Sequence, residues 1–180
     1  MCIRDRVGGD KDGHPGVDEK TMLGSLQMSR GALLKWLLSE FEGFLENLNP
    51  LLHSSSKKNH IALLERSIKD LKKHFRNARV IRAGDSHRVQ KLREKFDHLA
   101  KSYIEIFAVE SSALARIRHF FRIFPGLVVP LEIREESGIV HEAVNNPHKN
   151  LNIKRMLQTL AKISPCLLYT SDAADEGLGV

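Results

Sequence analysis

The densest group of chemically useful residues is the segment 8–15, which reads Gly-Gly-Asp-Lys-Asp-Gly-His-Pro. Glycines let the backbone approach a ligand closely at positive φ, and a proline fixes the direction in which the chain leaves. Lys11 stands between two aspartates and offers a single positive charge suited to an anion such as phosphate. On these residues alone an ordinary turn is the stronger interpretation, because Gly, Asp and Pro dominate turns. The residues predicted to form the loop are Gly8, Gly9, Asp10, Asp12 and Gly13.

Metal binding within this chain is not predicted. The spacing of Asp10 and Asp12 is that of a calcium loop, but the downstream oxygen ligands and the closing glutamate are missing. The histidines are scattered over predicted helical surfaces without a convincing ligand pair. His141 is followed by a glutamate but lacks the second histidine of a zinc-protease helix.

A second group of polar residues follows a short apolar run. Residues 127–133 are β-branched and apolar on both faces, which is typical of a strand buried on both sides in a parallel sheet or barrel. Pro130 cannot donate to a sheet ladder, so it indicates a bulge or an edge. Arg134 leads the polar cluster after the run, where barrel folds keep their chemistry.

Most of the remaining sequence has the apolar spacing of helices. Asp18 is placed to cap a first helix that Asn49 and Pro50 would end. A second stripe runs from Ile61 to Phe75, a third helix is expected from Ser86 to Phe120, and a last one over 151–163. The predicted class is mainly α with a short β element, with two long antiparallel helices packed inside a larger helical body.

The formal net charge is +6. A basic balance is compatible with a helical module that binds nucleic acid or partner helices, and this is the alternative function. Lys and Arg are mixed with Glu and Asp along the predicted helical faces, which favours a solvated surface instead. No apolar run is long enough for a membrane span and no secretory pattern is present, so the expected compartment is the cytoplasm.

The two ends of the chain are related at the level of DNA. Residues 1–6 can be encoded by ATGTGTATAAGAGACAG, whose reverse complement reads through residues 166–171. The relation indicates a translated sequencing adapter, derived from a transposase mosaic end, at both edges of an insert. We therefore expect 1–6 and 166–180 to be adapter-derived and 7–165 to be an internal segment of a longer protein. Cys2 and Cys166 fall in these ends, so no disulfide or thiolate site is expected.

Two motifs in order resemble phosphoenolpyruvate carboxylase. The segment 8–15 and the following Ser29 and Arg30 are similar to that family's Gly-Gly-Asp-Arg-Asp-Gly-Asn-Pro loop and the helix after it. Residues 129–137, which read Val-Pro-Leu-Glu-Ile-Arg-Glu-Glu-Ser and precede His141, resemble its Val-Pro-Leu-x-x-Leu-Asp-Ile-Arg-Gln-Glu-Ser strand. The resemblance is closest over 7–30 and 124–141, and the middle is similar only in pattern.

The resemblance implies a segment of a helix-elaborated (α/β) TIM-like barrel. The family is a carbon-dioxide-fixing lyase that joins phosphoenolpyruvate to bicarbonate, with Mg²⁺ or Mn²⁺, to give phosphate and oxaloacetate for the tricarboxylic acid cycle. Arranged cations and the metal would stabilise its carboxyphosphate and enolate intermediates. The resemblance also implies a homo-oligomer that binds neither nucleic acid nor a membrane.

The resemblance assigns substrate binding to Lys11 and Arg134. Lys11 stands where the family usually has an arginine directed at substrate phosphate, and lysine keeps the charge but loses the bidentate fork. Arg134 either faces the barrel mouth or pairs with Glu135, Glu136 or Asp10. His14 replaces an asparagine and receives no role. The family's catalytic histidine precedes this segment, and its metal carboxylates and catalytic lysine follow it. No catalytic residue or metal ligand is therefore expected here, and the chain alone should be inactive.

Overall fold

The structure, a computed structural model, describes residues 18–54, 58–129, 137–146 and 148–163. The predicted mainly α class is confirmed, and no strand occurs in these ranges. The described residues fall into two compact units, one within 26–129 and one made of 18–25 with residues from 137 to 163. The helices are α1 (Glu19–Ser54), α2 (Lys58–Asn77), α3 (Asp85–Phe107), α4 (Ser112–Ile123), α5 (Ser137–Asn145) and α6 (Leu151–Ile163).

The first helix begins where the sequence predicts. The backbone N–H of Thr21 donates to Asp18 Oδ1 at 2.9 Å, and the Thr21 hydroxyl donates to the same oxygen at 2.9 Å. These bonds satisfy one of the free N–H groups of the first turn and hold the pKa of Asp18 below its usual value, with the backbone bond as the main cause. The capping role predicted for Asp18 is confirmed.

The predicted end of this helix at Asn49 and Pro50 is wrong, because α1 continues through Pro50 to Ser54. A proline inside a helix removes the hydrogen bond to the carbonyl four residues earlier. That carbonyl belongs to Glu46, and both Glu46 and Pro50 are exposed, so water can take the place of the missing donor. Beyond the proline, Leu52 packs on the core and favours continuation of the helix.

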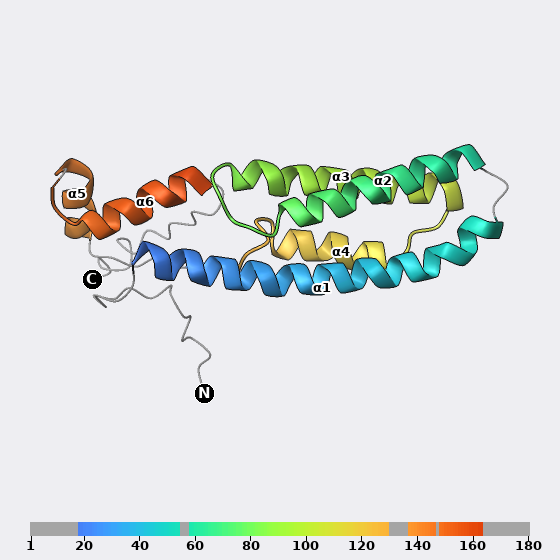
Figure 1. Ribbon diagram of the computed structural model, residues 1–180, viewed down its shortest axis with the longest axis horizontal. Helices are drawn as coiled ribbons and strands as arrows, with labels where there is room; N and C mark the ends of the chain where they lie inside the picture. The colour runs from blue at the N-terminus through green and yellow to red at the C-terminus, as the bar shows by residue number, and fades with distance from the viewer. Residues whose placement is uncertain (1–17, 55–57, 130–136, 147, 164–180) are drawn as a thin grey trace, which may run out of the picture. The chain divides into compact units, whose positions relative to one another are not determined.

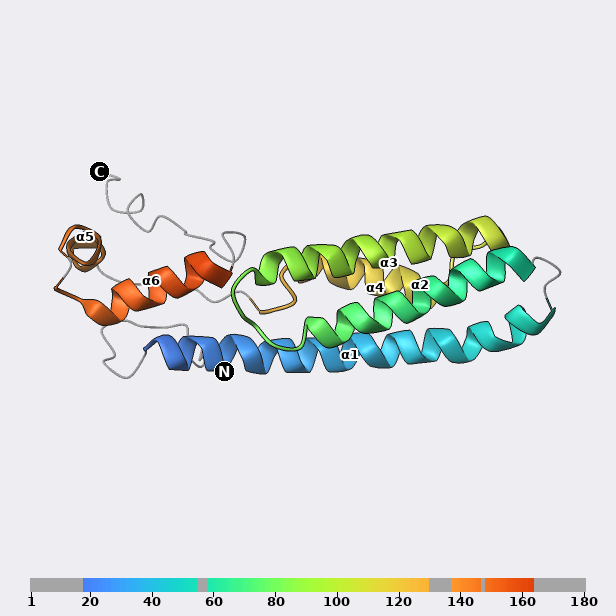
Figure 2. The same cartoon turned by 45° about the horizontal axis from the view of Figure 1, so that its top comes forward.

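Helices α1 to α4 form a bundle within residues 26–129. Successive helices run in alternating directions, with α2 beside α3 (Figures 1 and 2), and a ring contact and an ion pair join α4 to α1. The apolar stripes predicted from helical spacing supply the buried core, which therefore extends along the length of the bundle. Fully buried members include Leu37, Phe41, Phe44, Leu64, Leu71, Phe75, Leu92, Phe96 and Leu99.

Ring contacts join the helices across this core. The ring centroids of Phe41 and Phe75 lie 5.4 Å apart and connect α1 to α2, and Phe44 meets Tyr103 of α3 at 5.5 Å. Trp36 of α1 stacks on a ring of α4, Phe120, with centroids 4.4 Å apart. Aromatic pairs at such separations add to the burial energy of the rings. The aromatic residues thus fix how α1 sits against its neighbours.

The single helix predicted from Ser86 to Phe120 is wrong, because the chain breaks into α3 and α4. Ala108 adopts the left-handed conformation at φ 56°, and its N–H closes α3 on the carbonyl of Ile104 at 2.8 Å. Ser111 then caps a new helix that runs back. Ile106 and Ala113 lie on either side of the break and are seven residues apart, so the repeat of apolar residues continues across it. Periodicity alone therefore could not reveal the break.

Replacing Ala108 with glycine should raise the free energy of unfolding by about 0.5–1 kcal/mol. Left-handed backbone costs an alanine roughly 1–2 kcal/mol, and the extra freedom of glycine in the unfolded chain offsets part of the gain. The reverse change at Gly84, which has φ 70°, serves as the control and should lower stability by a similar amount. Urea unfolding of both variants measures the change in the free energy of unfolding at each position. A change in the same direction in both variants would contradict the prediction.

The short β element predicted over 127–133 is not found in residues 127–129, the part of it that the structure describes. Residues 127 and 128 form a bend, and Leu127 has φ 52°, which is incompatible with a strand. Gly126 and Leu127 are instead held as a turn whose carbonyls serve a buried arginine. Residues 130–136 lie outside the described ranges.

The other unit contains the start of α1 together with α5 and α6. The predicted helix over 151–163 is confirmed as α6, whose Ile153, Met156, Leu160 and Ile163 are buried. Helix α5 was not predicted. It is joined to the segment before α6 by Glu142, which accepts from Lys149 at 2.6 Å and from Asn150 at 2.9 Å. The Thr159 hydroxyl of α6 donates to Glu19 of α1.

Candidate functional site

The residues predicted to bind substrate or form the loop lie outside the described ranges. This holds for Lys11, for Arg134 and for the loop residues Gly8, Gly9, Asp10, Asp12 and Gly13. Their predicted roles remain predictions. What the structure describes is the helix directly after the first motif and the turn directly before the second, and these two elements meet at one buried side chain.

That side chain is Arg30, which is fully buried in α1. Its Nε donates to the Leu127 carbonyl at 2.8 Å, and Nη1 donates to the Ala78 carbonyl at 2.8 Å. Nη2 donates to the Gly126 carbonyl at 2.9 Å. The carboxylate of Asp85 completes the set as a two-point partner, at 2.7 Å from Nη2 and 3.3 Å from Nη1.

Every N–H of this guanidinium has a partner, since an arginine offers five donors and five acceptors surround it. A buried charge persists only when it is paired and hydrogen-bonded, and Asp85 at 2 % side-chain exposure supplies the opposite charge. No donor is left for a ligand. Arg30 therefore holds segments together, and we name it with Asp85 the Arg30–Asp85 node.

Two neighbours of Arg30 on α1 bind the same segments. Gln27 donates from Nε2 to the Arg79 carbonyl at 2.6 Å and accepts the Ile81 N–H at 3.0 Å, so it binds the loop after α2 on either side of Val80. Ser29 Oγ accepts the N–H of Val129 at 3.3 Å. One turn of α1 thus binds the loop between α2 and α3 and the turn after α4.

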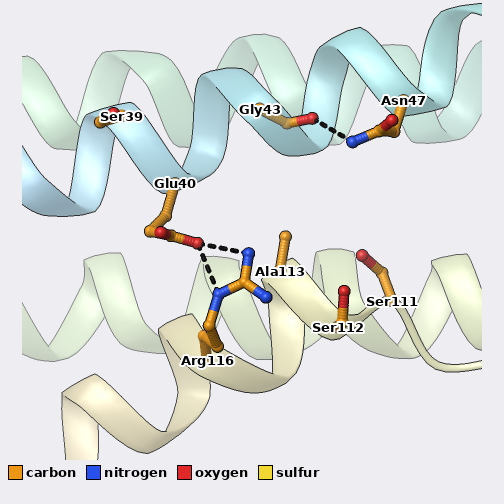
Figure 3. A pocket seen from close by; sticks show the side chains of 8 residues that line it. All are labelled: Ser39, Glu40, Gly43, Asn47, Ser111, Ser112, Ala113 and Arg116. Carbon is orange, nitrogen blue, oxygen red and sulfur yellow. Dashed lines mark hydrogen bonds and ion pairs between the residues drawn. The ribbon is translucent and has the colours of Figure 1, made fainter.

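A polar groove of about 450 Å³ lies between the middle of α1 and the start of α4 (Figure 3). The Arg116 guanidinium points across it to Glu40, with Nε and Nη2 at 2.8 and 2.7 Å from Oε2. Asn47 donates to the Gly43 carbonyl at 2.8 Å on the α1 wall. The other lining residues are Ser39, Ser111, Ser112 and Ala113.

This groove offers hydrogen bonds but no pair suited to covalent catalysis. Its serines have no histidine or lysine among the described lining residues to act as a general base. The Ser111 hydroxyl makes no hydrogen bond to the helix it caps, and Arg116 is already paired with Glu40. Among the described residues, the groove is a polar junction between α1 and α4 that the Glu40–Arg116 ion pair crosses.

No carboxylate and histidine group able to hold a metal ion occurs in the described part of the chain. The acidic groups with shifted pKa are held by cations or hydrogen bonds. The bond from Lys95 lowers the pKa of Asp70, and the bond from Lys149 lowers that of Glu142. In the same pair, Glu142 raises the pKa of Lys149. Helices in these ranges are also too short or too polar to cross a membrane.

Sequence reasoning did not identify the Arg30–Asp85 node. A signal was present, since Arg30 lies four residues after Leu26 and four before Leu34, both buried, on the apolar stripe of α1. A charged residue in such a stripe indicates a buried pair. Its partner Asp85 directly precedes Ser86, where the third helix was expected to begin, and nothing local distinguishes it from a turn residue.

Comparison of the chain with protein-family models, with curated proteins and with solved structures gives no match.

Proposed function

We propose that residues 7–165 are an internal segment of a cytoplasmic, homo-oligomeric phosphoenolpyruvate carboxylase. The parent enzyme would form oxaloacetate and phosphate from phosphoenolpyruvate and bicarbonate. Two uncommon motifs in the family's order support the proposal, one at residues 8–15 and one at 129–137. Lys11 and Arg134 would supply positive charge to the anionic substrate, whose charge is best stabilised by preorganised cations.

The strongest structural support for the proposal is a set of contacts between the two motif regions. Ser29 and Arg30 lie on the helix that follows the first motif, and they bind backbone groups of Gly126, Leu127 and Val129, of which Val129 begins the second motif. The bond from Val129 to Ser29 spans 100 positions of sequence. Two motifs that serve one substrate need such a connection, and Arg30 supplies it with buried, charge-assisted hydrogen bonds.

The finer fold is part of the proposal. The helices over 26–129 would be one of the helical elaborations of an (α/β) barrel, and a barrel strand would begin after Val129. Mg²⁺ or Mn²⁺ would act as the Lewis acid that stabilises the enolate. Its carboxylate ligands, the catalytic lysine and the catalytic histidine would come from parts of the parent outside this sequence.

The proposal is tested on the longer reading frame of the source gene. That frame should continue on both sides of residues 7–165 and encode a histidine motif upstream and a Gly/Arg-rich loop downstream. The expressed parent should form oxaloacetate only with phosphoenolpyruvate, bicarbonate and a divalent metal, as read by a coupled dehydrogenase. The 180-residue chain is the control and should be inactive, because a site that lacks several cooperating members has little activity. A parent without this activity refutes the proposal.

In the parent enzyme, Lys11→Ala should lower kcat/KM by about 10- to 100-fold, which corresponds to about 1.5–3 kcal/mol for one charge-assisted contact to phosphate. Lys11→Arg is the matched control and should keep most activity, because it restores the family's usual residue. Steady-state kinetics over a range of phosphoenolpyruvate concentrations measures both. If Lys11 only neutralises Asp10 and Asp12 within a turn, Lys11→Ala will lower the unfolding midpoint while kcat/KM stays unchanged.

A further inference from the structure

Positive charge within residues 26–129 is concentrated in one stretch. Residues 66–93 hold ten Lys and Arg against two acidic residues, Asp70 and Asp85, whereas the rest of that unit holds nine against eight. The even mixing of charges expected from the sequence therefore does not apply to this stretch. We call residues 66–93 the basic hairpin, because they comprise the second half of α2, the following loop and the first part of α3.

Both acidic groups of the basic hairpin are occupied within the fold. Asp85 is buried against Arg30 at 2.7 Å. Asp70 binds Lys95 of α3 at 2.8 Å and faces His74 at 3.5 Å. Neither carboxylate is available to neutralise the outer surface of the hairpin. The exposed basic side chains are those of Arg66, Lys69, Lys72, Lys73, Arg76, Arg79, Arg82 and Lys91.

The fold places the two helices that carry most of these side chains next to one another. The ion pair between Asp70 and Lys95 places the second half of α2 against the first part of α3, and both views show the two helices side by side (Figures 1 and 2). On α2, Lys69, Lys73 and Arg76 follow at steps of four and three, so they share one helical face. Charges spaced about 5–6 Å apart along a helix form a continuous positive surface.

The residue types on this surface indicate which kind of anionic partner it fits. Among its described residues, Val80 is the one large hydrophobic side chain that is exposed. A protein interface needs an apolar or aromatic centre, and an interfacial helix needs an apolar face to enter a membrane. Binding to nucleic acid can rest on phosphate contacts alone. We propose that the basic hairpin binds the phosphate backbone of duplex nucleic acid without reading its sequence.

The resemblance to a carboxylase implies that the parent binds no nucleic acid, so this inference departs from that expectation and is argued only from the charges and exposure of residues 66–93. Its test uses the 180-residue chain and a fluorescent duplex of mixed sequence in an anisotropy titration. We expect binding at 50 mM salt that weakens about 100-fold by 200 mM salt, as displaced counterions require for about four phosphate contacts. Duplexes of unrelated sequence should bind equally well.

The decisive comparison is between two variants that each lose two exposed charges. Lys73→Gln/Arg76→Gln should weaken binding about tenfold or more and reduce the salt slope by about 2, whereas Lys35→Gln/Lys101→Gln, outside the hairpin, should bind nearly as well as the parent chain. Glutamine keeps the helix propensity, so circular dichroism and thermal midpoints should match. Equal losses in the two variants, or no binding at 50 mM salt, would overturn the proposal. Tighter binding to polyglutamate or to anionic vesicles than to the duplex would also overturn it.

Discussion

Asp85→Ala should lower the free energy of unfolding by about 3–5 kcal/mol, because it leaves the Arg30 guanidinium buried without a charge partner. The hydrogen bonds to the three backbone carbonyls would remain, but the positive charge in the core would be uncompensated. Urea unfolding followed by circular dichroism measures the loss, provided that the m-value is unchanged.

Glu110→Ala supplies the control, because Glu110 pairs with Arg118 while both side chains are substantially exposed. That change should cost less than about 1 kcal/mol. In the Arg30→Leu background, Asp85→Ala should cost less than it does alone, since the two changes act on one pair and such pairs couple by about 0.5–3 kcal/mol. Additive losses, or an Asp85 effect no larger than the Glu110 effect, would show that the node carries no buried charge.

Leu64→Ala should lower the free energy of unfolding by about 2–5 kcal/mol. Leu64 is 0 % exposed on the inner face of α2 and belongs to the bundle core, so its removal leaves a cavity there. The adjacent Leu63 is 57 % exposed and provides a control of identical chemistry on the same helix.

Leu63→Ala should change stability by no more than about 0.5 kcal/mol, the usual range for surface sites. The difference between the two variants depends only on which face of α2 is turned inward. Similar losses at both positions would mean that α2 is rotated or that its outer face is covered by another element.

The sequence is sufficient to predict helices that have strong local signals. Asp18 caps α1, the apolar stripe of α2 matches its buried face, and α6 has the bounds expected for the last helix. The failures occurred where tertiary contacts override local rules. Pro50 does not end α1, because the affected carbonyl can reach water and Leu52 still reaches the core. The break after Phe107 preserves the apolar repeat and so leaves no periodic trace.

The candidate site was less accessible to sequence reasoning than the fold. The Arg30–Asp85 node joins residues that are 55 positions apart, and no local pattern links an arginine in one helix to an aspartate at the start of another. Long-range pairing of this kind depends on how the four helices assemble. The segments with the strongest motif resemblance, which contain Lys11 and Arg134, lie outside the described ranges, so their roles rest on the sequence.

The contacts of Arg30 also bear on the order of events in folding. They connect residues 48, 55, 96 and 97 positions apart, so the guanidinium can lose its water only after α1 has met both the hairpin and the turn after α4. Closing such long loops is costly before the contacts form, so these bonds should be made late. Weakening the node would then mainly accelerate unfolding and leave the folding rate nearly unchanged. In the wild-type protein the Arg30–Asp85 node would therefore lower the unfolding rate of the bundle and give it kinetic stability.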